Sequence, residues 1–502
     1  MTRRPNIVLI QADQLAAAAL GAYGNEVVQT PHLDALAEQG VVFDRAYCNS
    51  PLCAPSRASM MTGQLPSRIG AYDNAADFAS SVPTFAHLLR AAGYRTTLIG
   101  RMHFIGPDQL HGFEERLTTD VYPAGLDMVP EWDLQPTERL AWYHDAGSVF
   151  AAGASRATVQ RDFDDEVVFR TQRHLNDLAR STSDDPFLLV ASFIHPHDPD
   201  EPPAEHGARD EGVEIDEPRV ATMDLADLDP HSRRLQQMSG FDQKVPDADE
   251  TRRARRAYYA AVSYVDDNVG AILRRLDELG LRDDTVVVVT SDHGDMLGER
   301  GLWYKMSPFE QSARVPLVVS APRRFAAKRV DDLVSLVDVL PTLVELAGAE
   351  PVEGPGRSLV PALTGDVVLD DDVVIEYLAE GVSAPHVTVV RGPHKFVHCP
   401  GDPDQLFDLA SDPDELVNVV DRPDLADAVT SLREVVAQRY DLDALARDVR
   451  ASQQRRRIVR HALAQGTEHV WDHAPGGRAD DYVRGDFWGA LERGRIPATD
   501  PR

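Results

Sequence analysis

The strongest constraint on the fold is a long amphipathic segment that leads directly into a run of almost pure valine. From 252 to 279, apolar residues recur at three- and four-residue spacing, which is the period of one helix face. Gly280 ends this segment, and the valine run 285–290 follows. Continuous valine predicts a strand covered on both faces, as strands in parallel sheets are. The sequence therefore predicts an α/β protein with a mainly parallel central sheet.

The first 365 residues repeat this alternation of strands and helices. Buried strands are expected at 6–10, 94–99 and 187–194. Two helices are expected to begin at Pro31 and Pro83, because proline suits the first helical turn. The segment 198–246 is rich in Asp and Pro with little periodicity, which is typical of a surface loop.

The pattern changes after about residue 365. Short apolar runs at 373–377, 386–391 and 395–399 are separated by turns, which indicates a small antiparallel sheet. Helical segments are expected from about 424 to 465. We therefore predict three regions: an α/β domain at 1–365, a C-terminal antiparallel sheet with helices at 366–465, and a tail at 466–502.

Composition excludes two classes of partner. The formal charge is −30, so the surface is expected to repel nucleic acid and anionic membranes, which bind basic faces. No apolar stretch is long enough to cross a bilayer, and the N-terminal segment lacks the features of a signal peptide. Three cysteines form an odd set, which does not suggest a disulfide framework. These features predict a cytoplasmic protein.

Polar residues rich in Asp and His follow four of the predicted strands. In an open α/β sheet, ligands bind at the carboxyl ends of the strands, so these clusters are expected to meet. Their residue types favour a metal-assisted site. The clusters are Asp13–Gln14, Arg101–His103, His195–Asp198 and Asp292–Asp295.

A fifth cluster, Cys53-Ala54-Pro55-Ser56-Arg57, opens a predicted helix that ends at Gly63. Taken alone, it is compatible with a small buried cysteine near a helix start. It is also compatible with a reactive thiolate that the helix dipole and Arg57 stabilise.

The pattern C-x-P-x-R resembles the signature of the sulfatase family, in which this cysteine is oxidised to formylglycine. The resemblance extends from residue 5 to beyond residue 480 and implies an alkaline-phosphatase-like α/β sandwich with a small C-terminal antiparallel sheet. It also implies a formylglycine-generating or similar maturation enzyme as a partner. The other segments that carry it are Gly100–His103, Pro196–His197, Tyr264–Asp266, Ser291–Asp295 and Asp338–Thr342.

Within the family, the chain is similar to choline sulfatases. Segments typical of that branch are Ser50–Pro55, Tyr72–Ala76, Gly106–Glu114 and Leu302–Met306. Two residues depart from the pattern: Arg101 stands where the family usually has lysine, and Met128 where choline sulfatases tend to carry tryptophan. An aromatic face stabilises a quaternary ammonium, so Met128 weakens the expectation of choline as the alcohol.

The resemblance implies a role for each candidate residue. The expected ligands of one divalent cation, calcium or manganese, are Asp13, Gln14, Asp292 and His293. The expected catalytic residues are Cys53, Arg57, Arg101, His103, His197 and Lys305. The expected substrate-binding residues are Asn74, Met128, Trp132 and Glu380, with Trp132 as a substitute aromatic or a structural residue. Weaker candidates are Asp73 and Glu376, and His195 is expected to be structural.

The leading hypothesis is a type I sulfatase that hydrolyses choline-O-sulfate. The same machinery also suits an aryl sulfate, or a phosphonate or phosphate ester. A protein of another class, which binds metal or an anion and never converts its cysteine, is the remaining alternative. Because choline sulfatases assemble through C-terminal tails, the resemblance implies a homodimer or homotetramer.

Overall fold

An eight-stranded sheet forms the centre of the computed structural model, which describes residues 4–209, 212–365, 369, 372–467 and 470–475. The strands lie in the order β4-β3-β5-β1-β6-β7-β2-β8, and every neighbouring pair is parallel except the two that involve β7. The strands are β1 (Asn6–Ala12), β2 (Val41–Tyr47), β3 (Arg95–Gly100), β4 (Glu115–Arg116), β5 (Phe187–Phe193), β6 (Thr285–Ser291), β7 (Leu317–Ser320) and β8 (Lys328–Ser335).

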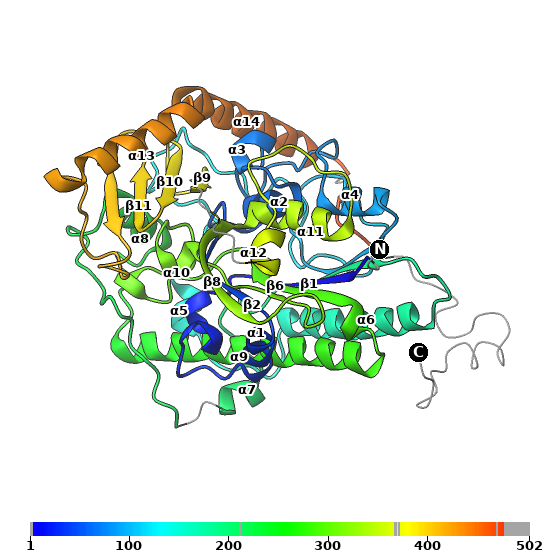
Figure 1. Ribbon diagram of the computed structural model, residues 1–502. Helices are drawn as coiled ribbons and strands as arrows, with labels where there is room; N and C mark the ends of the chain where they lie inside the picture. Colours follow the sequence, from blue (N-terminus) through cyan, green and yellow to red (C-terminus); the bar gives the residue numbers. More distant parts are fainter. Residues whose placement is uncertain (1–3, 210–211, 366–368, 370–371, 468–469, 476–502) are drawn as a thin grey trace.

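Helices cover both faces of this sheet (Figure 1). Alternate residues of β1 explain why, because Ile7 and Leu9 pack with Met60 and Leu340, whereas the residues between them face the opposite layer. The first layer contains α2 (Cys53–Thr62), α4 (Phe85–Ala91) and α11 (Val339–Ala347). The second contains α1 (Pro31–Glu38), α6 (Val159–Arg180) and α9 (Ala248–Glu278). The predicted α/β architecture is confirmed.

The position of β1 determines where the polar clusters meet. β1 lies between β5 and β6 and pairs with both in parallel, so the segments that follow all three strands leave the sheet at one edge. Asp13 follows β1, His195 and His197 follow β5, and Asp292 follows β6. The sheet itself therefore brings together residues that are up to 279 positions apart in the chain.

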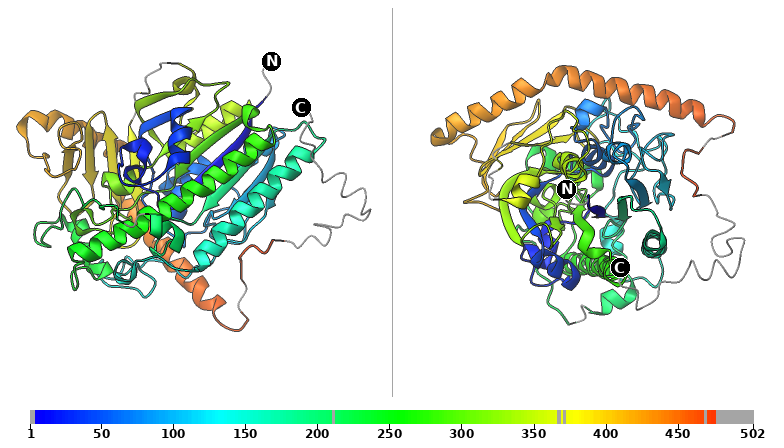
Figure 2. Two further views of the ribbon diagram at one scale, coloured as in Figure 1. Left: turned by 90° about the horizontal axis from the view of Figure 1, so that it is seen from below. Right: turned by 45° about the vertical axis from the view of Figure 1, so that its right-hand side comes forward.

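A second sheet lies beside the first, and its four strands are antiparallel in the order β12-β11-β10-β9. They are β9 (Val373–Tyr377), β10 (His386–Arg391), β11 (His394–His398) and β12 (Gln405–Asp408), of which β12 was not expected from the sequence. α13 (Ala426–Arg439) packs on this sheet, and α14 (Leu442–Leu463) continues across the top of the molecule toward the large sheet (Figures 1 and 2). Division of the chain at residue 365 stays a prediction.

The prediction of a surface loop at 198–246 is wrong. This segment contains α7 (Ala204–Arg209) and α8 (Pro230–Ser239), and α8 buries His231, Leu235 and Met238. Asp229 caps α8 and Gly240 ends it in a left-handed conformation, so the local signals were present. The helix is hard to recognise in the sequence because it is short and its buried face is partly polar.

Short helices complete the described structure. The α-helices are α3 (Pro66–Ile69), α5 (Gly147–Ala151), α10 (Glu310–Ala313) and α12 (Val360–Thr364). The 3₁₀ helices are Ala17–Ala19, Gly21–Tyr23, Arg282–Asp284, Glu299–Gly301, Leu336–Asp338 and Pro423–Leu425. Among the described helices, none combines the length and apolarity needed to span a membrane. Of the predicted tail, residues 476–502 lie outside the described residues.

Candidate active site

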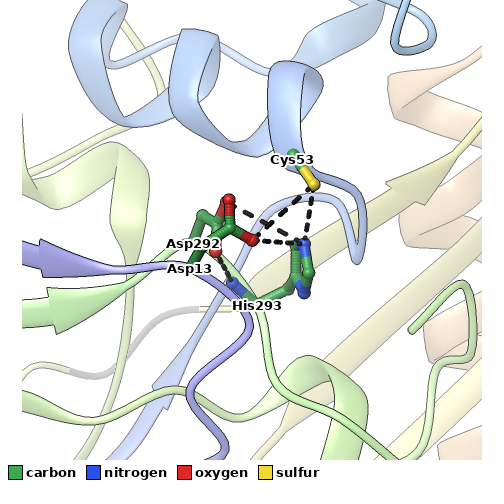
Figure 3. A group of neighbouring side chains, drawn as sticks. All are labelled: Asp13, Cys53, Asp292 and His293. Carbon is green, nitrogen blue, oxygen red and sulfur yellow. Dashed lines mark hydrogen bonds and ion pairs between the residues drawn. The ribbon is translucent and has the colours of Figure 1, made fainter. Parts of the chain in front are cut away.

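Four buried side chains converge where β1, β6 and α2 meet (Figure 3). Asp13 follows β1, Asp292 and His293 follow β6, and Cys53 is the first residue of α2. One ligand atom from each of these residues lies within 4.8 Å of the others. Two carboxylates, an imidazole nitrogen and a sulfur atom thus face one small volume, which is the donor density that a divalent cation requires.

The histidine of this group presents a lone pair to it. His293 Nδ1 lies 3.0 Å from the carbonyl oxygen of Gly294, so this nitrogen carries the proton and donates it to the carbonyl. His293 Nε2 then carries no proton, and it lies 3.2 Å from Cys53 Sγ and 3.8 Å from Asp13 Oδ1. Burial lowers the pKa of His293, which favours the neutral form that binds metals.

Two buried arginines hold the carboxylates. Arg57 donates from Nη2 to Asp13 Oδ2 at 2.9 Å and from Nε to Asp292 Oδ2 at 2.8 Å. Arg101 Nε lies 2.7 Å from the same Asp13 oxygen. Burial alone would raise the pKa of Asp13, but Arg101 and Arg57 bring it below the usual value. Both carboxylates are therefore charged and oriented before any cation binds.

Gln14 lies beside the four residues and is held from three sides. It has a positive φ of 64°, and its backbone N–H donates to Asp292 Oδ1 at 3.0 Å. Its side-chain oxygen accepts from Lys305, while its Nε2 donates to Asp295 Oδ2. The amide oxygen is thus kept on the side of the positively charged residues, and its role as a metal ligand stays a prediction.

The surroundings of Cys53 disfavour ionisation of its thiol. Burial and the neighbouring Asp13 carboxylate raise its pKa to about 12. This shift favours the thiol over the thiolate before any cation binds. All three cysteines of the chain are buried and free, as expected from their number.

Lys305 lies at the centre of a second cluster on the same side of the sheet. Its Nζ lies 2.8 Å from His197 Nε2 and 3.2 Å from His144 Nε2. His197 Nδ1 contacts the carbonyl oxygen of Asp198 at 2.7 Å, so Nε2 is the nitrogen that faces Lys305. Burial and Lys305 lower the pKa of His197 well below the usual value. His144 was not predicted, because it lies in an irregular segment without a recognisable motif.

His103 and Arg101 both contact the ring of Tyr122, a residue that the sequence did not single out. The Arg101 guanidinium lies 4.2 Å from the centroid of the Tyr122 ring, and the His103 ring stacks on the same tyrosine at 5.4 Å. His103 Nε2 is buried and has no hydrogen-bond partner in the described parts of the chain. Burial and Arg101 lower the pKa of His103 to about 3, so this imidazole is neutral before substrate binds.

Two of the predicted substrate-binding residues, Asn74 and Glu380, differ in whether their side-chain oxygens already have hydrogen-bond partners. Asn74 Oδ1 accepts from the N–H of Ala54 at 3.0 Å, which places Asn74 beside the residue that follows Cys53. Glu380 is 2% exposed, and its Oε2 has no hydrogen-bond partner within the described ranges. Burial raises the pKa of Glu380 to about 7. A buried carboxylate oxygen without a partner is costly, so Oε2 marks Glu380 as a candidate ligand for a cation.

The two positions discussed for an aromatic contact behave differently. Met128 is half-buried in a cluster around Ala54, and Trp471 packs against the same cluster. Trp132 is 4% exposed and donates from its indole nitrogen to the carbonyl oxygen of Ala379 at 2.7 Å, which is a structural contact. No sequence pattern links Trp471 to Met128, which lies 343 residues earlier in the chain.

The weaker candidates are engaged by other residues. Asp73 forms an ion pair with Arg456, and Glu376 accepts hydrogen bonds from Ser67 and Tyr440. His195, expected to be structural, is 1% exposed and contacts Asp164 through Nδ1 at 2.7 Å.

Family models match almost the whole chain. The sulfatase model matches residues 5–349, the model for the N-sulphoglucosamine sulphohydrolase C-terminal region matches 298–441, and the model for the choline sulfatase enzyme C terminal matches 447–495. The chain belongs to the sulfatase family. The C-x-P-x-R segment and the group around Cys53 lie within the first of these matches.

Individual relatives agree with this sulfatase assignment. The choline-sulfatase of Rhizobium meliloti (strain 1021) is 44% identical in an alignment of 496 residues that covers 96% of this chain and 96% of its own. The arylsulfatase of Clostridium perfringens is 30% identical and covers 68% of this chain and 75% of its own. The phosphonate monoester hydrolase of Agrobacterium radiobacter shares the fold with a TM-score of 0.67 at 24% identity, and covers 88% of this chain and 96% of its own.

The predicted family and alkaline-phosphatase-like fold are therefore confirmed, and this sulfatase is a sulfuric ester hydrolase. The alternative of a protein without enzymatic activity is set aside. Sulfatases generally use a formylglycine and a divalent cation, and the residues around Cys53 have the donor set for such a cation.

Proposed function

We propose that this sulfatase hydrolyses choline-O-sulfate to choline and sulfate. The substrate carries a sulfate at one end and a quaternary ammonium at the other. Lys305 and Arg101 supply positive charge for the sulfate, and the buried carboxylate of Glu380 suits the ammonium. The buried Oε2 of Glu380, which has no partner among the described residues, carries the proposal, and 44% identity to a choline-sulfatase supports it.

We assign the metal ligands as Asp13, Gln14, Asp292 and His293. Three of them lie in the buried group around Cys53, and Gln14 adjoins it through Asp292. A set rich in oxygen with one imidazole suits calcium or manganese better than zinc, which favours nitrogen and sulfur. When bound, the cation offsets the negative charge of the sulfate oxygens during attack.

Residue 53 supplies the nucleophile in this proposal. A maturation enzyme would oxidise it to formylglycine, whose hydrate would supply one hydroxyl to attack sulfur as choline leaves and a second hydroxyl whose loss of a proton would let sulfate leave. Arg57 stays within the carboxylate pair and fixes the geometry around residue 53. Position 53 is the start of α2, so the helix dipole also favours the negative charge that develops there.

The remaining catalytic residues bind sulfate and transfer protons. Lys305 and Arg101 bind sulfate oxygens, and a planar guanidinium can bind two of them at once. One of His103 and His197 protonates the leaving oxygen of choline, and the other accepts the proton from the second hydroxyl of residue 53. Both imidazoles are neutral before binding, and the negative charge of the sulfate favours protonation of the one it contacts.

The proposed substrate is tested by kinetics on three esters side by side: choline-O-sulfate, 4-nitrophenyl sulfate and a phosphonate monoester. We expect kcat/KM to be highest for choline-O-sulfate. A preference for either other ester by orders of magnitude would replace choline-O-sulfate with that class. We further propose a homodimer or homotetramer, which sedimentation measures directly, while cytoplasmic location stays a prediction from the sequence.

A further inference from the structure

The residues proposed to bind the substrate lie on three loops that are far apart in the sequence. Asn74 lies on the first, Met128 and Trp132 on the second, and Glu380 on the third. All three loops contact one element, the C-terminal helix α14 (Leu442–Leu463), which runs along the top of the molecule (Figure 1). The contacts come from side chains on successive turns of that helix.

The first loop is held by a buried ion pair. Arg456 of α14 donates from both terminal nitrogens to Asp73, at 2.6 and 2.7 Å, and Asp73 is fully buried. Asp73 Oδ1 also accepts from the N–H of Ala75 at 3.0 Å, so both neighbours of Asn74 are fixed. Asn74 in turn accepts from the N–H of Ala54, beside the nucleophile position. A short chain of contacts thus leads from α14 to the reacting residue.

The second and third loops are joined through Gln453. This glutamine is 1% exposed, and its Oε1 accepts from the N–H of Trp132 at 2.9 Å. The indole of Trp132 donates to the carbonyl oxygen of Ala379, the residue before Glu380. Arg450, one turn earlier on α14, donates to the carbonyl oxygen of Ser383 at 2.7 Å. The loop that carries Glu380 is therefore fixed from both ends.

Other contacts of α14 to the second loop are less buried than those of Arg456 and Gln453. Arg457 pairs with Glu131 and Arg460 with Asp127, and Arg460 and Asp127 are both more than half exposed. Exposed pairs contribute little, because water and salt screen them. The buried contacts of Arg456 and Gln453 therefore carry most of the positioning.

We propose that α14 assembles the part of the active site that recognises the alcohol, with Arg456 and Gln453 as its positioning residues. Neither residue is placed to touch the sulfate or residue 53, so their effect acts through Asn74, Trp132 and Glu380. This inference rests on the proposed function, because it assigns the alcohol-binding side of that same site. On this proposal, the residues at the strand ends perform the chemistry, and α14 holds the residues that recognise choline.

The test compares Arg456→Ala with the milder Arg456→Lys, and with Arg455→Ala as a matched control. Arg455 is adjacent on α14 but exposed, and the described structure gives it no ion pair. For Arg456→Ala we expect KM for choline-O-sulfate to rise about tenfold, because the two charge-assisted hydrogen bonds to Asp73 that hold the loop of Asn74 are lost. We expect kcat for 4-nitrophenyl sulfate to change less than about twofold, Arg456→Lys to recover part of the KM effect, and Arg455→Ala to match wild type.

A double-variant cycle identifies the route of the effect. If Arg456 acts through Asn74, the KM increases of Asn74→Ala and Arg456→Ala are not multiplicative when combined. Gln453→Ala provides a second variant with an uncharged side chain should Arg456→Ala not fold, and it is expected to show the same selective KM effect.

Three results would overturn the proposal: equal loss on both substrates, multiplicative effects of the Asn74 and Arg456 variants, or a Gln453→Ala enzyme with wild-type KM. If wild type instead prefers another ester, the proposed substrate fails, and the same cycle on the preferred ester still decides whether α14 positions Asn74.

Discussion

Replacing Glu380 by glutamine tests whether its buried carboxylate receives the cationic part of the substrate. At an effective dielectric constant of about 20, a carboxylate about 5 Å from a cation contributes roughly 3 kcal/mol. Solvent reduces this value, so we expect KM for choline-O-sulfate to rise between about tenfold and a hundredfold in Glu380→Gln at pH 8. The kcat for 4-nitrophenyl sulfate, which has no cationic group, should stay near that of wild type.

The pH dependence provides a second readout for the same residue. Because burial raises the pKa of Glu380 to about 7, its carboxylate is ionised above this pH and protonated below it. KM for choline-O-sulfate in wild type should therefore rise about tenfold between pH 8 and pH 6, relative to KM for the aryl sulfate. Glu380→Gln should abolish this relative change.

Stability offers an independent check on Glu380. The folded protein retains the proton up to about pH 7, whereas the unfolded chain releases it near the ordinary value of 4.5. Rising pH across this window therefore destabilises the folded state, by about 3 kcal/mol in total at about 1.4 kcal/mol for each pKa unit. Glu380→Gln should raise the melting temperature at pH 8 and leave it unchanged at pH 4. A variant that melts lower at pH 8, with an unchanged KM for choline-O-sulfate, would refute the assignment.

Three further outcomes are expected. In steady-state kinetics, His103→Asn and His197→Asn should each lower kcat by about 10²–10⁴-fold with little change in KM, because proton transfer acts in the transition state. A change confined to KM would show that these histidines only position the substrate. Met128→Trp should lower KM for choline-O-sulfate by about two- to thirtyfold, because an aromatic face contributes about 0.5–2 kcal/mol to binding a cation. KM for the aryl sulfate should not change. An equal effect on both esters would contradict this reason. Removal of the cation by a chelator should abolish turnover, and added calcium or manganese should restore it. Calorimetry should show that Asp292→Asn no longer binds the cation that restores activity. Full activity in the presence of the chelator would exclude a role for the metal.

The sequence predicts those parts of the fold that local patterns determine. The valine strand β6 and the helix α9 before it were placed within a few residues, because burial on both faces and helical periodicity leave clear patterns. The meeting of Asp13 with Asp292 followed from the rule that parallel strands share a carboxyl edge. By contrast, α8 has local capping signals, but its buried face is partly polar, and distant contacts such as His231 Nε2 with the carbonyl oxygen of Met306 at 2.7 Å satisfy that face.

The same distinction applies to the site. The C-x-P-x-R segment and the strand-end clusters are contiguous, so they can be read from the sequence. Tyr122 and His144 lie in irregular segments, and their neighbours Arg101 and Lys305 come from other parts of the chain. The pair of Asp73 and Arg456 joins residues 383 positions apart, and a charge pair at that distance leaves no sequence pattern.

The central claim is that Cys53 is the precursor of the nucleophile within the buried cation site. The most direct measurement is the mass of the peptide that carries residue 53, determined on enzyme that is active on choline-O-sulfate, alongside a Cys53→Ala preparation. The account predicts that the fraction of this peptide that carries formylglycine rises in proportion to activity. It also predicts that the Cys53→Ala protein is folded but inactive. Full activity in a preparation whose peptide carries only unmodified cysteine, or near wild-type activity in Cys53→Ala, would contradict it.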